Sequence, residues 1–308
     1  MNSVILDLGA NKGQNLEYYL SRADRVIAVE GVPSFSEQIR SDFGAEIEQG
    51  RLVLLNVIVA SKDFANRNLG ITTIYESKNR PGESTLNDHM NQEGWIGHKV
   101  PVWSISRILE SQLGKEDQIE FIKIDLEGSD KMVLDEILVA PEFLPRFMSV
   151  EIHDLKIVDS ILTSKKFKSF RIEKAGFPAK AESNFRFSRI SSGPFGYDIK
   201  GSWFNDEAVA TMAKVHSPYA RDIHVASVQM PNLRSRISIY FYFLKIKESL
   251  QIQIQRSWLQ IATPILKRST TLSFRNRVRI LKNLRNFTKK KRRDKKIVQE
   301  FQNYTREI

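Results

Sequence analysis

The sequence predicts an α/β fold in which an open, largely parallel sheet carries helices on both faces. Short apolar runs that suit buried strands alternate with helical patterns through residues 4–175. Several of these runs end in an acidic residue, and the carboxyl ends of strands in such sheets form the ligand edge. Beyond residue 230, by contrast, Lys and Arg dominate. We therefore predict an α/β domain followed by a basic, mainly helical C-terminal extension.

Composition excludes several classes of chemistry. The chain has 308 residues and no cysteine, so disulfides, thiolate zinc sites and cysteine nucleophiles are excluded. A cytoplasmic protein fits this composition. The first residues lead directly into an apolar strand pattern, which does not resemble a signal peptide, and no 18 apolar residues run together. We expect neither a secretory leader nor a spanning helix.

The charge is unevenly divided along the chain. Residues 231–308 hold 20 Lys and Arg against 4 Asp and Glu, a balance of +16. The first 230 residues hold 27 Lys and Arg against 32 Asp and Glu, a balance of −5, so the net charge of the whole chain is +11. This division predicts a main domain over residues 1–200, a connecting segment over 201–230 and a basic helical extension over 231–308.

A glycine turn opens the predicted domain. An apolar strand pattern containing Asp7 runs into Gly9 and Gly13, and a helical pattern follows directly. Such a turn brings a ligand close to the backbone at the positive end of a helix. The spacing departs from the G-x-G-x-x-G of dinucleotide-binding turns. A ligand that carries an amino acid and a cation suits a carboxylate such as Asp7, which points to S-adenosylmethionine, with a purely structural turn as the alternative.

Two further strand ends extend the predicted cofactor site. The run at residues 25–29 ends in Glu30, about 20 residues beyond the turn, where a carboxylate binds ribose hydroxyls. Enzymes that use NAD share this arrangement. A third strand is expected over residues 51–60, and we place the adenine near its end. The predicted cofactor-binding residues are Asp7, Gly9, Ala10, Asn11, Gly13, Glu30, Ala60 and Ser61.

The segment between residues 64 and 105 has a looser pattern. Short strands are expected at 71–75 and 99–103, with a long polar stretch between them that contains His89, Trp95 and His98. Each of these three is individually more typical of a surface or packing residue. Because long loops in compact domains are commonly functional, the segment as a whole is our candidate for acceptor contacts. A later turn-rich loop at residues 191–198 could close over the same cleft.

A second chemical centre follows two later strands. The strand at residues 119–124 leads into Asp125 and Glu127, and the strand at 147–152 carries Glu151 and precedes His153. Alternation along a strand places Glu151 and His153 on one face. A histidine beside carboxylates suits a general base, and the same atoms could instead hold a divalent metal or simply meet solvent. We predict these four residues as catalytic and assign no metal ligand.

Four motifs in order resemble the FkbM-type family of S-adenosylmethionine-dependent methyltransferases. They are Leu6-Asp7-Leu8-Gly9-Ala10-Asn11-Lys12-Gly13, Val29-Glu30, Lys123-Ile124-Asp125-Leu126-Glu127-Gly128 and Val150-Glu151-Ile152-His153, and the resemblance covers residues 3–175. It implies a seven-stranded, Rossmann-like class I fold and methyl transfer to a hydroxyl, commonly on a sugar or secondary metabolite. Two positions depart from the family pattern: Ile105-Ser106 replaces Leu-Asp, and Ser129-Asp130 replaces Ala-Glu.

The resulting hypothesis is an O-methyltransferase in which His153, supported by Glu151 or Asp125, takes the acceptor proton. Its partner would be a small-molecule or glycan acceptor. A nucleic-acid methyltransferase and a non-catalytic scaffold on the same fold are the alternatives.

The C-terminal extension allows three interpretations. Apolar residues recur at helical steps from Ile246 to Ile265, and a dense cationic run occupies residues 289–296. Peripheral contact of residues 239–296 with an anionic membrane, nucleic-acid binding and a solvated or packed appendage all fit, with nucleic acid the least favoured. The sequence does not predict the oligomeric state.

Overall fold

The computed structural model describes residues 1–79, 84–86, 93–126, 128–140, 143–174, 179–180, 189–190, 193–199, 203–206, 209–210, 220–231 and 233–234. Residues 1–239 form one compact unit. The predicted extension over residues 231–308 falls almost entirely outside the described residues, as do His89 and the catalytic candidate Glu127.

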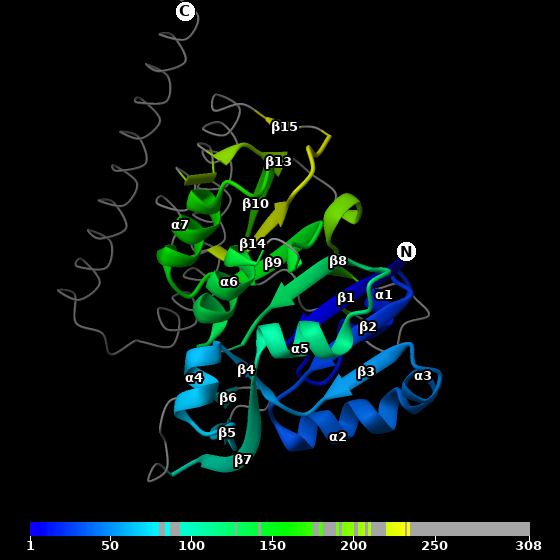
Figure 1. Ribbon diagram of the computed structural model, residues 1–308, viewed down its shortest axis with the longest axis vertical. Coiled ribbons are helices and arrows are strands. Elements are labelled where there is room, and N and C mark those ends of the chain that lie inside the picture. Colours follow the sequence, from blue (N-terminus) through cyan, green and yellow to red (C-terminus); the bar gives the residue numbers. More distant parts are fainter. Residues whose placement is uncertain are drawn as a thin grey trace, which may run out of the picture. The chain divides into compact units, whose positions relative to one another are not determined.

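A mainly parallel sheet forms the centre of the domain (Figure 1). Within the described residues it has nine strands, in the order β15-β13-β10-β14-β9-β8-β1-β2-β3. Neighbours from β3 to β9 pair in parallel, whereas β14 runs antiparallel to both β9 and β10. The strands are β1 Asn2–Leu8, β2 Arg25–Val29, β3 Leu52–Leu55, β8 Asp117–Ile124, β9 Phe147–Glu151, β10 Ser169–Lys174, β13 Trp203–Phe204, β14 Ala220–Ala226 and β15 Leu233–Arg234.

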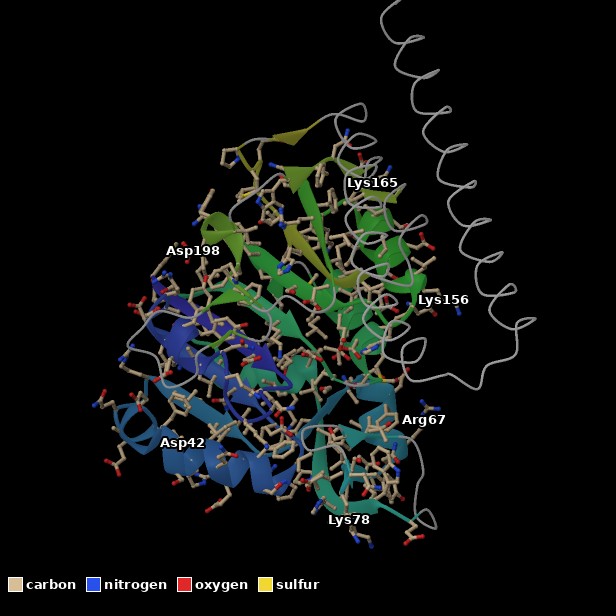
Figure 2. The ribbon with its side chains drawn as sticks, turned by 180° about the vertical axis from the view of Figure 1, so that it is seen from behind. Asp42, Arg67, Lys78, Lys156, Lys165 and Asp198 are labelled. Carbon is tan, nitrogen blue, oxygen red and sulfur yellow. The ribbon has the colours of Figure 1, made fainter. Side chains whose placement is uncertain are left out.

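Helices cover both faces of this sheet, which confirms the predicted α/β fold. α5 (Ile105–Gln112), α6 (Asp130–Val139) and α7 (Leu155–Ser164) contact one another in succession on the face seen in Figure 1. α1 (Leu16–Leu20) lies on the opposite face, seen in Figure 2. There the ring of Tyr19 packs against Phe121 of β8, with 5.6 Å between ring centroids. α2 (Pro33–Asp42) and α3 (Gly44–Glu48) follow β2.

The central strands are continuous apolar runs because both of their faces are covered. In β1, Val4, Ile5, Leu6 and Leu8 are completely buried, and Asp7 between them is buried as well. Parallel strands covered on both faces show such runs rather than alternation. The parallel arrangement brings the carboxyl ends of β1, β2, β8 and β9 to one edge.

The third predicted strand is divided in two. Residues 52–55 form β3 at the edge of the main sheet, whereas β4 (Ile58–Ala60) leaves it and pairs in parallel with β7. Asn56 lies at the division, and its amide donates hydrogen bonds to the carbonyls of Glu30 and Gly31 at 2.8 and 3.2 Å. The prediction of one strand over residues 51–60 was wrong, because an apolar run specifies burial and not the partner strand.

A small second sheet has the order β4-β7-β5-β6 in the described part of the chain. Its long strands are β5 (Ile71–Ser77) and β7 (Trp95–Ser104), an antiparallel pair that confirms and lengthens the two strands predicted in this segment. β6 is Ser84–Thr85, and α4 is Lys62–Arg67. Apolar side chains of this sheet pack on Val32 and Phe35, directly after β2. The small sheet therefore stands beside the ligand edge.

The main sheet also extends beyond residue 200. β14, from the segment expected to be a connection, inserts between β9 and β10. A short hairpin pairs β11 (Ala179–Lys180) with β12 (Arg189–Ile190), and a 3-10 turn spans Gly196–Asp198. Among the described residues, no helix is both long and apolar enough to cross a membrane.

Candidate active site at the carboxyl edge of the sheet

The glycine turn after β1 is held by backbone contacts. The amides of Gly9 and Ala10 both donate to the carbonyl of Val29 at 3.0 Å. Gly9 and Gly13 have positive φ angles of 85° and 79°. A Cβ on Gly9 would lie 1.8 Å from the carbonyl oxygen of Asp125. The absence of a side chain at Gly9 therefore leaves space for the backbone carbonyl of Asp125. From the sequence, this space was expected to serve a ligand.

Glu30 closes the turn against β2. Its side chain is buried, and its two carboxylate oxygens accept the backbone amides of Asn11 and Val32, both at 2.7 Å. Burial raises the pKa of Glu30 to about 7, although the two amide hydrogen bonds lower it. Glu30 thus fixes the conformation of the turn, and the binding of ribose hydroxyls stays a prediction.

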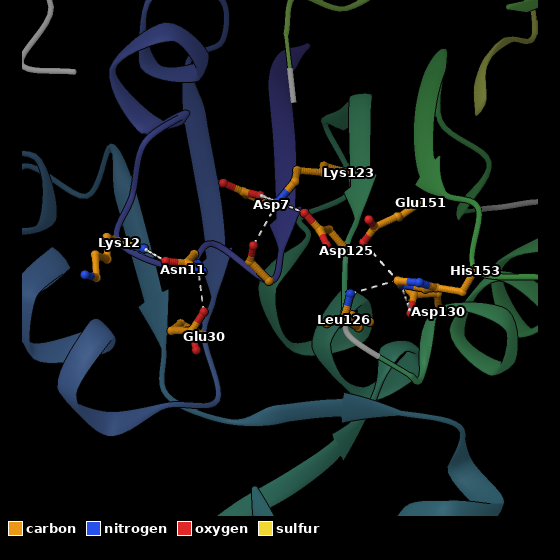
Figure 3. A network of polar contacts seen from close by, with 11 residues as sticks. Asp7, Asn11, Lys12, Glu30, Lys123, Asp125, Leu126, Asp130, Glu151 and His153 are labelled. Atoms are coloured by element: carbon orange, nitrogen blue, oxygen red, sulfur yellow. Dashed lines mark hydrogen bonds and ion pairs between the residues drawn. The ribbon is translucent and has the colours of Figure 1, made fainter. Parts of the chain in front are cut away.

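A buried ion-pair group lies next to the turn (Figure 3). The Nζ of Lys123 on β8 is 3.3 Å from Asp7 Oδ1 and 3.2 Å from Asp125 Oδ2, and it donates to the carbonyl of Gly9 at 2.8 Å. Burial raises the pKa of Asp7, and the ammonium of Lys123 opposes that change. Burial also works against the charge of Lys123, but the two carboxylates raise the pKa of Lys123 overall and keep it cationic. Asp7 is completely buried, so in this structure it contacts the protein and not solvent.

Sequence reasoning did not single out Lys123. The signal was present, because one lysine stands inside a strand that is otherwise buried and apolar, two residues before an aspartate. A buried lysine requires a partner of opposite charge, and the parallel neighbour β1 supplies Asp7.

The second predicted cluster is brought together by β8, β9 and α6. His153 Nε2 is 3.1 Å from Glu151 Oε2 and 3.6 Å from Asp130 Oδ2. Burial raises the pKa of Glu151, His153 lowers it, and the neighbouring Asp125 raises it further. The structure thus unites Asp125, Glu151 and His153 as predicted, and their catalytic roles stay predictions.

Asp130 is a member of this cluster that the sequence reasoning missed. Its carboxylate is buried and accepts the amides of Leu126 at 2.8 Å and Gly128 at 3.1 Å. It therefore holds the loop after β8 while facing His153 (Figure 3). An acidic residue in the first turn of a helix was the available signal, because free amides gather there.

The predicted adenine contacts lie at the end of β4. Ala60 is completely buried, and the hydroxyl of Ser61 accepts the amide of Phe64 to cap α4. Ser129 ties this strand to the loop before α6 by donating to the carbonyl of Val59 at 2.9 Å. Ser61 retains exposed surface beside the edge, whereas Ala60 offers none.

His98 belongs elsewhere, since its Nε2 lies 3.0 Å from Glu76 within the small sheet. Trp95 begins β7. No group of three or more metal-ligating side chains gathers to hold an ion within the described residues.

The chemistry of the edge suits a cationic, hydroxyl-bearing ligand. Carboxylates predominate there over the ammonium of Lys123 and the imidazole of His153. Asp7, Glu30 and Asp130 are buried, whereas Asp125 and Glu151 retain exposed surface toward a ligand. Carboxylates accept hydrogen bonds from hydroxyls and attract a sulfonium. The residues present therefore fit S-adenosylmethionine.

Comparison with known proteins places the chain in a family. The model of the methyltransferase FkbM domain matches residues 7–169. Among curated proteins, none matches the chain significantly.

Among solved structures, the FkbM methyltransferase of Methylobacillus flagellatus KT is 17% identical, with a TM-score of 0.37, over 56% of this chain and 40% of that one. The O-methyltransferase of Bacillus cereus in complex with S-adenosylhomocysteine is 12% identical, with a TM-score of 0.34, over 73% of this chain and 74% of that one. An rRNA methylase of Streptococcus thermophilus is 8% identical, with a TM-score of 0.32, over 74% and 87%. The family match spans more than half of the sequence and includes the first motif from Asp7 onward and the other three in full, so the chain belongs to the FkbM family of methyltransferases.

Proposed function

We propose that this protein is an S-adenosylmethionine-dependent O-methyltransferase that methylates a hydroxyl of a sugar, a glycan or a secondary metabolite. One observation carries the proposal. The imidazole of His153 lies against Glu151, 3.1 Å away, at the same sheet edge as the glycine turn. A base and a cofactor turn on one edge are what methyl transfer to a hydroxyl requires.

The cofactor-binding part would consist of the turn from Gly9 to Gly13, with Glu30 and Ser61 at its side. When bound, S-adenosylmethionine supplies a methyl group on a good leaving group. The task of the protein is then to hold the acceptor oxygen in line and to remove its proton.

His153 suits the removal of that proton. The carboxylates of Glu151 and Asp130 both lie near Nε2 of His153. They orient the imidazole and stabilise the cation that forms when the ring takes a proton. Asp125 stands between this pair and the cofactor turn, because its carboxylate contacts Lys123.

A second candidate is methylation of a nucleic acid. The balance of +16 over residues 231–308 favours it, because clustered Lys and Arg bind phosphates. Such an enzyme would bind RNA or DNA with a strong dependence on salt, whereas a small-molecule enzyme would not. A non-catalytic scaffold would function with Glu30 destroyed.

Calorimetric titration of the protein with S-adenosylhomocysteine, and separately with NAD, tests the cofactor. We expect micromolar binding of the first, at least a tenfold loss in Glu30→Ala, and no binding of NAD. Binding of NAD instead, or equal binding of S-adenosylhomocysteine by Glu30→Ala, would contradict the proposed cofactor site.

Methyl transfer to a panel of sugars, glycans and RNA tests the acceptor and the base. His153→Ala is expected to bind S-adenosylhomocysteine normally but to lose about 10²–10⁴ in turnover, the usual contribution of a general base. His98→Ala is measured in parallel, because that histidine is paired with Glu76 in the small sheet and not with the carboxylates around His153. As part of the segment proposed to contact the acceptor, it can change the KM for the acceptor, but it should retain kcat. Wild-type turnover in His153→Ala would remove it as the base.

A further inference from the structure

Lys123 lies at the meeting point of the two halves of the site. Its side chain is 5% exposed and rises from β8, between the cofactor turn and the carboxylates on the acceptor side. An ammonium has three donors. Three oxygens surround this one: the carbonyl of Gly9 at 2.8 Å, Asp125 Oδ2 at 3.2 Å and Asp7 Oδ1 at 3.3 Å.

These three oxygens come from different parts of the site. Asp7 belongs to β1, and Asp125 follows β8 (Figure 3). Gly9 begins the turn directly after β1. The backbone joins the same parts, because the amide of Asp125 donates to the carbonyl of Leu8 at 3.0 Å. The absence of a side chain at Gly9 lets the carbonyl of Asp125 pack on the turn. The end of β8 and the turn therefore form one packed unit around the ammonium.

The acceptor side begins where this unit ends. Burial is the main cause of the raised pKa of Glu151, and the neighbouring carboxylate of Asp125 raises it further. Glu151 in turn contacts His153. A displaced Asp125 would therefore disturb the partner that orients the imidazole.

We propose that Lys123 is a positioning residue that clamps the cofactor turn onto Asp125 and thereby holds the cofactor side and the acceptor side in one fixed geometry. It touches neither substrate in this role. The inference rests on the proposed function, because it takes the glycine turn to be the cofactor site.

The test compares Lys123→Met with the wild-type chain in two measurements: calorimetric titration with S-adenosylhomocysteine and amide hydrogen exchange followed by mass spectrometry. Methionine keeps the length of the side chain and removes the charge and the donors. We expect at least tenfold weaker binding of S-adenosylhomocysteine. We also expect faster exchange in peptides covering residues 9–13 and 124–126, with β5 and β7 unchanged, because the clamp acts locally.

Two further variants keep the result interpretable. Lys131→Met removes a lysine whose ion pair with Asp135 is half-exposed on α6, and it should behave as wild type in both measurements. Asp7→Asn with Lys123→Met removes the ammonium together with the completely buried carboxylate of Asp7. The carboxylate of Asp125, which also loses its contact with Lys123, is 23% exposed and can be solvated. This double variant should also bind S-adenosylhomocysteine at least tenfold more weakly and show faster exchange at residues 9–13 and 124–126. It provides this result even if Lys123→Met alone does not fold.

Specific outcomes would overturn the role of Lys123. One is unchanged affinity for S-adenosylhomocysteine in the folded Lys123 variants, and another is exchange accelerated equally in the turn and in β5 and β7, which marks general destabilisation. If the wild-type chain itself does not bind S-adenosylhomocysteine, the proposed function fails instead.

Discussion

At the scale of single residues, Glu30 shows how burial changes the chemistry of a carboxylate. Its two oxygens accept amides from the turn and from the start of α2, and burial raises the pKa of Glu30 from 4.5 to about 7. The folded chain therefore binds more protons than the unfolded chain between these pH values. By linkage, the free energy of unfolding falls as pH rises across this window.

Replacement of Glu30 by glutamine should remove this pH dependence. Each unit of pKa shift corresponds to about 1.4 kcal/mol, so Glu30 contributes a fall of about 3 kcal/mol in the free energy of unfolding between pH 4.5 and 7. Urea unfolding at several pH values measures this fall in the wild-type chain and in Glu30→Gln. The variant should also be less stable by about 1–3 kcal/mol at low pH, because one amide loses its acceptor. Identical pH slopes would contradict the assignment.

At the scale of elements, the glycine turn derives its shape from two neighbouring strands. β2 supplies the carbonyl of Val29 and the carboxylate of Glu30, and the end of β8 supplies the carbonyl of Asp125. The turn is therefore fixed before any ligand arrives. Preorganisation of this kind reduces the entropy lost on binding.

Gly9→Ala should be far more damaging than Gly50→Ala. Both glycines have positive φ, 85° and 71°, so alanine costs backbone strain of about 1–2 kcal/mol at either position. Only at Gly9 would the new Cβ meet another atom, the Asp125 carbonyl at 1.8 Å, whereas nothing lies within 4 Å at Gly50. We expect Gly9→Ala to lose at least about 2 kcal/mol more in urea unfolding. Equal losses in the free energy of unfolding for the two variants would mean that the turn can move away from β8 at little cost.

At the scale of the whole molecule, the chain joins a mildly acidic domain to a strongly basic segment. Residues 231–308 carry a balance of +16, and apolar residues recur at helical steps between Ile246 and Ile265. An apolar helical face beside a cationic run is the pattern of segments that lie on anionic membranes. We therefore retain peripheral membrane contact through residues 239–296 as a proposal.

Vesicle flotation of the full chain tests this proposal. We expect recovery with vesicles that contain anionic lipid, little recovery with neutral vesicles, and release by salt, because surface charges are screened. Replacement of Lys289, Lys290, Lys291, Arg292 and Arg293 by glutamine should reduce recovery nearly to that with neutral vesicles. Each basic residue near the surface contributes about 1 kcal/mol, so five of them weaken binding by about 10³-fold or more. Equal recovery by both chains at low salt would exclude a role for this run.

The sequence predicted much of the site because the relevant rules are local or follow from parallel order. Asp125, Glu151 and His153 were placed together because parallel strands end at one edge. Lys123 and Asp130 were missed because their roles depend on partners in other elements. Lys123 pairs with Asp7 on β1. Asp130 accepts amides of the loop between β8 and α6 and faces His153.

The sequence by itself determined the α/β class, the glycine turn, the strand-end acids and the family, since apolar runs, glycines and acids at strand ends are properties of short segments. Tertiary structure alone decided that residues 52–60 serve two sheets, that β14 inserts between β9 and β10, and that Lys123 joins the turn to Asp125. The physical reason is common to all three. A short segment specifies whether its side chains are buried, but the strand or charge that meets them comes from residues distant in the sequence.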